Sequence, residues 1–86
     1  MRFFKFSQVF LSAFIYNVSM KIFAERLKEL RLEKEISQRK LAAQTTISPT
    51  AIRQWENGSC SPNAEAVVIL AEFFNISADY LLGLEN

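Results

Sequence analysis

Apolar residues recur at helical spacing along most of the chain, beginning near residue 21. Phe23, Leu27 and Leu30 stand at positions i, i+4 and i+7, and the opposite face of the same segment is charged. This spacing gathers the three apolar side chains on one side of a helix. The pattern therefore predicts an amphipathic helix over Ile22–Lys34.

Four shorter helices are predicted from their start signals, each a serine just before a helical segment. A serine hydroxyl accepts a hydrogen bond from a free N–H of the first turn, and proline is tolerated in that turn because its missing N–H costs nothing there. Gly58 marks one helix end, since glycine readily adopts the left-handed conformation. The predicted helices are Gln38–Gln44, Pro49–Asn57, Asn63–Phe74 and Ala78–Leu82, after Ser37, Ser48, Ser61 and Ser77.

These segments predict an all-α protein, a compact five-helix bundle. Only two glycines and two prolines occur in 86 residues, which suits helices joined by short turns. The expected core residues are Ala64, Val67, Val68, Ala71 and Phe74 of the fourth helix, and Tyr80, Leu81 and Leu84 in or just after the fifth.

Residues 1–19 differ from the rest, with five of the eight phenylalanines and no acidic residue. The uncharged run from Phe6 to Met20 is fifteen residues long, shorter than the roughly 18–20 apolar residues of a membrane span. Three interpretations stay open: an extension of little function upstream of a natural start at Met20, a packing or dimer element, and a membrane anchor, which the length disfavours. We divide the chain into an extension, 1–19, and a domain, 20–86.

The amino-acid composition excludes several kinds of structural and catalytic site. One cysteine and no histidine exclude an internal disulfide framework, a structural zinc site and catalysis that uses histidine. No glycine-rich phosphate loop occurs. We expect a cytoplasmic protein that is not an enzyme and that binds no metal or cofactor.

Charge is segregated along the chain, although the net charge is only +1. Residues 1–55 hold ten basic and four acidic residues, a net charge of +6, whereas residues 56–86 hold five acidic and no basic residues. The first part should attract a polyanion and the second should repel it.

Only residues 45–47 separate the second and third predicted helices. Two short helices joined by so tight a turn form a helix-turn-helix, whose second helix can enter the major groove of DNA. On a helical wheel the inward side of the third helix carries Ser48, Ile52, Trp55 and Glu56, and the outward side carries Thr50, Gln54 and Asn57, with Arg53 at its edge. Hydroxyl, amide and guanidinium groups read base edges or hold phosphates, although a solvated polar face has the same composition.

Several motifs in order resemble the phage repressor/Cro (XRE) family of helix-turn-helix regulators. The matching stretches are Ser37-Gln38-Arg39-Lys40-Leu41-Ala42, Ile47-Ser48, Ile52, Trp55-Glu56-Asn57-Gly58 and Asn75-Ile76-Ser77-Ala78-Asp79-Tyr80-Leu81-Leu82-Gly83-Leu84. The resemblance covers residues 21–86. It implies a lambda-repressor-like domain of five helices that binds operator DNA, usually as a two-fold dimer.

The resemblance also implies roles for single residues. Gln38 takes a phosphate contact at the start of its helix, where free N–H groups also face the anion. Arg31 and Glu56 resemble the family's internal ion pair, and Trp55 is expected in the core. The residues expected at the DNA are Gln38, Arg39, Ser48, Pro49, Thr50, Arg53, Gln54, Asn57 and Ser59.

Four residues depart from the family pattern. Pro49 offers a base only an apolar contact, such as one to a thymine methyl group. Thr45 and Thr46 stand in the turn where an apolar residue and a glycine are usual. Cys60 replaces a frequent lysine or arginine, so we expect moderate affinity. Besides backbone N–H groups, the residues left to hold phosphate in that loop are Ser59, Ser61 and Asn63.

The expected function is sequence-specific binding to double-stranded DNA by a homodimeric transcriptional regulator, a repressor, on a near-palindromic operator. An antitoxin or a controller of a restriction system uses the same DNA chemistry, so a toxin or another protein is an alternative partner. The competing hypothesis is a protein-interaction or membrane-tethered module whose helix-turn-helix no longer binds DNA. The apolar first segment and the near-neutral net charge favour that alternative.

Overall fold

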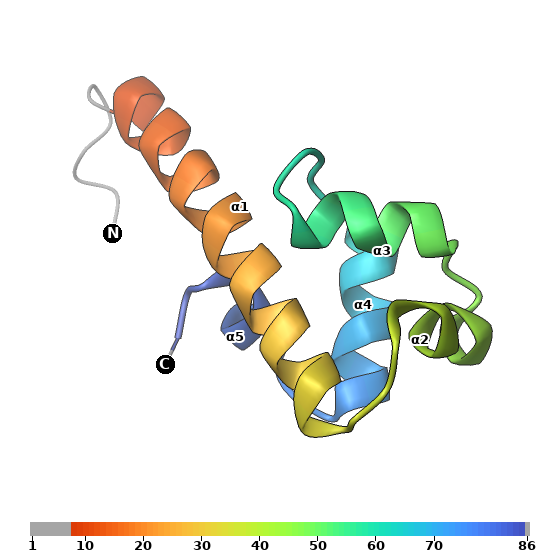
Figure 1. Ribbon diagram of the computed structural model, residues 1–86. Helices are drawn as coiled ribbons and strands as arrows, with labels where there is room; N and C mark the ends of the chain where they lie inside the picture. The colour runs from red at the N-terminus through yellow and green to blue at the C-terminus, as the bar shows by residue number, and fades with distance from the viewer. Residues whose placement is uncertain (1–7, 86) are drawn as a thin grey trace.

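The computed structural model describes the backbone of residues 8–85 and the side chains of residues 20–85 (Figure 1). Its helices are α1 (Gln8–Glu33), α2 (Gln38–Thr45), α3 (Pro49–Glu56), α4 (Ala64–Phe74) and α5 (Ala78–Leu82). No strand occurs within residues 8–85, which confirms the predicted all-α fold of five helices.

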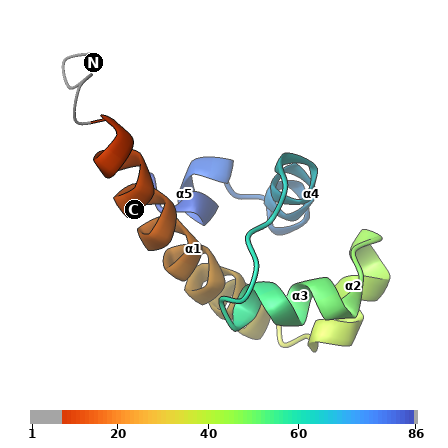
Figure 2. The ribbon, with the colours of Figure 1, turned by 90° about the horizontal axis from the view of Figure 1, so that it is seen from above.

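Helix α1 is longer than predicted, since it begins at Gln8 rather than Ile22 and spans 26 residues. The segment 8–21 contains no proline or glycine to end a helix, and its apolar residues have no clear amphipathic period. Figures 1 and 2 show the first turns of α1 extending past the other helices. No helix of residues 8–85 is long and apolar enough to cross a membrane. Residues 1–7 of the predicted extension lie outside the described residues.

Three of the four predicted serine caps are confirmed. In each, the Oγ atom accepts a hydrogen bond of 3.0 Å from the backbone N–H three residues later, and the three are Ser37, Ser48 and Ser77. The prediction for Ser61 is wrong, because α4 begins at Ala64 and Asn63 caps it, accepting a 2.8 Å hydrogen bond from the N–H of Ala66. Asparagine is as good a helix cap as serine, so the sequence offered two candidate caps, Ser61 and Asn63, two residues apart.

The core lies where the helices meet, with α1 against α3 and α5, and α2 against α3 and α4. Each helix supplies one fully buried aliphatic side chain, namely Leu27, Leu41, Ile52, Leu70 and Leu81. Trp55 is buried as predicted and lies edge-on to Phe23, with ring centroids 6.0 Å apart. Aromatic pairs in this arrangement add to the stabilisation that burial provides.

The predicted core face of α4 is partly wrong. Ala64 is exposed and Val68 is 52% exposed, whereas Ala66 and Leu70 are buried. Two glutamates seven residues apart mark the exposed side of α4, and Val68 lies between them on that side, so the sequence already indicated which face is buried. Leu84, also expected in the core, is 62% exposed, because the chain has left α5 by that point.

The turn between α2 and α3 contains a threonine in the left-handed region. Thr46 has a φ of 63° and ends α2. The preceding Thr45 is buried, and its hydroxyl donates a 2.7 Å hydrogen bond to the carbonyl of Leu41. A β-branched residue is disfavoured at positive φ, so Thr46 stores strain where glycine would not.

Thr46→Gly should therefore raise the free energy of unfolding by about 1 kcal/mol. Relief of the left-handed strain stabilises the folded state, and the greater entropy of glycine in the unfolded chain offsets part of that gain. Urea denaturation measures the change. Asn75→Gly is the matched control, since Asn75 also has positive φ (56°), and asparagine tolerates that region. Equal effects of the two substitutions would contradict strain at Thr46.

Candidate nucleic-acid interface

Helix α3 presents a polar outward face. Its inward side chains Ile52 and Trp55 are buried, while Thr50, Arg53 and Gln54 are exposed. Figure 2 shows α2 and α3 along one side of the bundle, with α4 and α5 on the other. The acidic C-terminal helices thus lie away from the outward face of α3.

Arg31, Glu56 and Gln38 form one hydrogen-bonded network behind this face. Arg31 donates from Nε to Glu56 Oε2 at 2.7 Å and from Nη2 to Glu56 Oε1 at 2.9 Å. Its Nη1 donates to the carbonyl of Ile36 at 2.9 Å. Gln38 Nε2 donates to Glu56 Oε1 at 3.0 Å. The network joins α1, the start of α2 and the end of α3.

The ion pair is shielded from water, with side-chain exposures of 10% for Arg31 and 5% for Glu56. The pKa of Arg31 is raised by its hydrogen bond to Glu56, while burial acts in the opposite direction and the charge of Glu56 adds a further rise. The guanidinium therefore stays charged and neutralises the carboxylate. Without that neutralisation, Glu56 would repel an anion approaching α3.

A concave pocket of about 240 Å³ lies over this network, lined by Lys28, Arg31, Gln38, Arg53, Glu56 and Asn57. Three of these residues are basic and one is acidic, and the acid is paired with Arg31. Lys28 and Arg53 are exposed and free to point toward a bound group. The pocket fits an anion such as a phosphate. Sequence reasoning missed Lys28, whose only signal was its place three residues before Arg31 on one helix.

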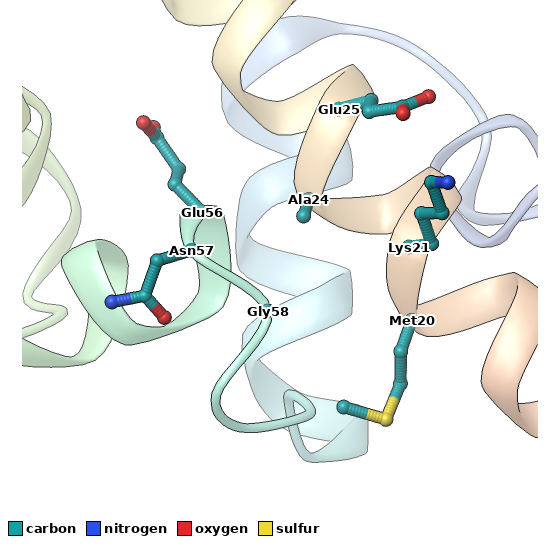
Figure 3. A pocket seen from close by; sticks show the side chains of 7 residues that line it. All are labelled: Met20, Lys21, Ala24, Glu25, Glu56, Asn57 and Gly58. Carbon is teal, nitrogen blue, oxygen red and sulfur yellow. The ribbon is translucent and has the colours of Figure 1, made fainter.

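A larger hollow of about 380 Å³ lies between α1 and the end of α3 (Figure 3). Its lining includes Lys21, Glu25 and Glu56, and because Glu56 is paired with Arg31, one basic and one acidic side chain remain. Figure 3 shows the Glu56 carboxylate turned away from Gly58 and Met20. With Glu25 beside Lys21, this hollow offers an anion no net attraction.

Two of the predicted DNA-binding residues, Asn57 and Ser59, are hydrogen-bonded to each other in the loop after α3. Asn57 Oδ1 accepts hydrogen bonds from the backbone N–H of Ser59, at 2.9 Å, and from its hydroxyl. The backbone N–H of Ser59 also donates a hydrogen bond to the carbonyl oxygen of Gln54, with 2.9 Å between nitrogen and oxygen. These contacts fix the loop on the last turn of α3.

The other predicted residues lie at the starts of α2 and α3 or line the smaller pocket. Ser48 caps α3, while Pro49 and Thr50 are exposed in its first turn. Arg39 is exposed near the start of α2. Gln38, Arg53 and Asn57 share the lining of the smaller pocket.

Arg26, one of the basic residues within residues 1–55, contacts other parts of the protein. Arg26 donates from Nη1 to the carbonyls of Tyr80 and of Glu85, the latter at 2.7 Å. Its guanidinium also lies 4.2 Å from the centre of the Tyr80 ring. Arg26 therefore fastens α1 to the end of the chain, and sequence reasoning did not single it out.

Comparison with known proteins gives one family. The helix-turn-helix family matches residues 27–81. The chain is 41% identical over 64 residues to the HTH-type transcriptional activator BcrR of Enterococcus faecalis, across 74% of this chain and 31% of that protein. No solved structure matches it.

Two proteins of Bacillus subtilis (strain 168) are also similar, each named an uncharacterized HTH-type transcriptional regulator. YobD is 32% identical over 65 residues, 76% of this chain and 58% of YobD. YqaE is 31% identical over 65 residues, 76% of this chain and 56% of YqaE. The chain spans less than two thirds of each of these three relatives.

Glu56→Ala should lower the free energy of unfolding by about 3–5 kcal/mol, because it strands the buried charge of Arg31. Urea denaturation measures the loss. The control Glu72→Ala, at an exposed position of α4, should change stability by no more than about 0.5 kcal/mol. Replacing both partners, Arg31→Met with Glu56→Leu, should cost less than Glu56→Ala alone. Similar midpoints for Glu56→Ala and Glu72→Ala would contradict a buried pair.

Proposed function

Because this chain belongs to the XRE-type helix-turn-helix family, we propose that it is a sequence-specific DNA-binding transcriptional regulator. The observation that carries the proposal is the outward face of α3, which presents exposed Thr50, Arg53 and Gln54 beside a basic pocket at the start of α2. In this proposal residues 20–86 form the DNA-binding domain.

In the proposed mechanism, one set of residues contacts the bases and another contacts the phosphate backbone. Helix α3 enters the major groove, where Thr50 and Gln54 meet base edges and Pro49 makes an apolar contact. A backbone phosphate sits in the pocket between Lys28, Arg53 and Gln38. The amide of Gln38 has a second N–H beside the one given to Glu56, and the free N–H groups at the start of α2 add to the attraction.

We also propose that two copies bind a near-palindromic operator, with half-sites about 34 Å apart. Repression is the proposed direction by resemblance to the phage repressors, whereas the Enterococcus relative is named an activator. Both directions use the same DNA contacts. A toxin or another protein partner is compatible with them, since it would occupy a different surface.

Binding to duplex DNA should weaken steeply with salt, because each phosphate contact releases counterions and contributes about −0.9 to the log–log slope. Lys28→Ala should reduce the slope by about 1. The control is Lys34→Ala, whose Nζ lies 5.6 Å from the Phe73 ring instead of in the pocket. Fluorescence anisotropy over a salt series measures both. Absence of binding at low salt would favour the protein-interaction alternative.

Gln54→Ala should weaken binding to the selected operator by about 1–3 kcal/mol and relax the preference at one or two base pairs per half-site. Gln38→Ala should weaken operator and random duplex by similar factors, because phosphate contacts carry no sequence information. Affinities for the operator, its single-base variants and random duplex give the comparison, at a temperature where both variants are folded. Equal weakening of every duplex by Gln54→Ala would show that α3 does not read the sequence.

A further inference from the structure

An apolar groove of about 320 Å³, which we call the α1–α5 groove, lies between these two helices. Its lining residues are Leu30, Ile76, Ser77, Tyr80 and Glu85. Figure 2 shows α5 on the opposite side of the bundle from α2 and α3. A partner in this groove therefore leaves the outward face of α3 free.

Acidic residues surround the α1–α5 groove. On the segments that line it, the exposed acidic residues are Glu29, Glu33, Asp79 and Glu85. Arg26 and Lys34 stand four residues before and after Leu30 on α1, and their cationic groups lie over the rings of Tyr80 and Phe73. Acidic residues outnumber these two bases, so the groove fits an apolar segment that carries positive charge.

The first six residues of the chain, MRFFKF, have this composition. They include three phenylalanines, the basic residues Arg2 and Lys5, and no acidic residue. Aromatic side chains bury a large apolar surface, and the two basic residues complement an acidic rim.

This segment cannot reach the α1–α5 groove of its own chain. Leu30 follows Gln8 by 22 residues of continuous helix, which is about 33 Å along the axis. Phe3 stands five residues before Gln8, a reach of at most about 18 Å for an extended chain. Figures 1 and 2 show the first turns of α1 leading away from the other helices. A segment of this composition in the groove therefore has to come from a second copy.

The first half of α1 suits an antiparallel pairing of two copies. Helical spacing places Leu11, Ile15 and Val18 on the same side of α1 as Ile22. In an antiparallel pair, Leu11 of each copy comes level with Ile22 of the other, and Ile15 with Val18, so each layer is apolar. A two-fold dimer requires such self-complementarity. This side of α1 leads to the α1–α5 groove, since Ile22 packs against Gly83 directly after α5.

We propose that two copies form a two-fold dimer in which residues 1–6 of each copy bind the α1–α5 groove of the other. The phenylalanines fill the apolar lining, and Arg2 and Lys5 face the acidic rim that Glu29 and Glu33 form on α1. The two α1 helices run antiparallel beside each other. The inference rests on the proposed homodimer and names the surfaces that join its two copies.

Sedimentation equilibrium of the full chain without DNA measures the dimer dissociation constant. Reversing the charge of the segment, by Arg2→Glu with Lys5→Glu, should weaken the dimer by about tenfold or more, because each dimer contains the contact twice. Reversing the rim, by Glu29→Lys with Glu33→Lys, should weaken it to a similar extent. The chain that carries all four substitutions should recover the affinity of the unaltered chain to within about threefold, because opposite charges meet again.

The matched control is Glu65→Lys with Glu72→Lys, which changes the net charge as the rim variant does, on the exposed side of α4, and should leave the dissociation constant unchanged. Phe3→Ser with Phe4→Ser keeps every charge and should also weaken the dimer by about tenfold or more. The four glutamates are exposed, so their variants should keep the helical circular dichroism of the unaltered chain.

Three results would each overturn the proposal: a monomeric full chain, a dimer that survives both the charge reversal and the phenylalanine substitutions in the segment, or no recovery when all four charges are reversed. Fluorescence anisotropy with duplex DNA on the same proteins tests the DNA-binding function separately. A chain that binds DNA as a monomer would overturn only the dimer, whereas a dimer that binds no DNA would overturn only the DNA-binding function.

Discussion

The orientation of α3 depends on the ion pair between Arg31 and Glu56. Helix α3 is only eight residues long, and its apolar contacts with the core come from Ile52 and Trp55, with Ala51 packed beside them. The bidentate contact from Arg31, joined by Gln38, ties the end of this helix to α1 and α2. Such a contact fixes an angle as well as a distance, because both groups are planar. The outward face of α3 follows from that constraint.

The basic residues divide into two groups with different tasks. Arg26 and Arg31 direct their guanidinium groups into the protein, where they bind backbone carbonyls and a carboxylate. Lys28 and Arg53 remain exposed beside the smaller pocket. Counting charges along the sequence therefore overstates the charge that DNA would meet. The near-neutral net charge is compatible with DNA binding, because α4 and α5, the helices without basic residues, lie on the other side of the bundle from α2 and α3 (Figure 2).

The departures from the family pattern have distinct physical consequences. Thr45 is buried and satisfies its hydroxyl within its own helix, so a polar residue is tolerated where an apolar one is usual. Thr46 is the strained position, because its conformation favours glycine. Cys60 removes a charge from the loop and places a thiol beside Gln54. The three residues thus affect packing, backbone strain and the outward face of α3 respectively.

The sequence by itself determined the five helices, most of their ends and the inward and outward sides of α3. These features depend on caps, breakers and periodicity within a few residues. Tertiary structure alone decided the full length of α1, the place of Lys28 in the pocket and the contact of Gln38 with Glu56. It also placed the Cys60 thiol against Gln54. Each of these depends on how separate segments meet or on a signal too uniform to read locally. Gln38 and Glu56, for example, are 18 residues apart. A resemblance can suggest such pairs, but only packing brings their atoms within bonding distance.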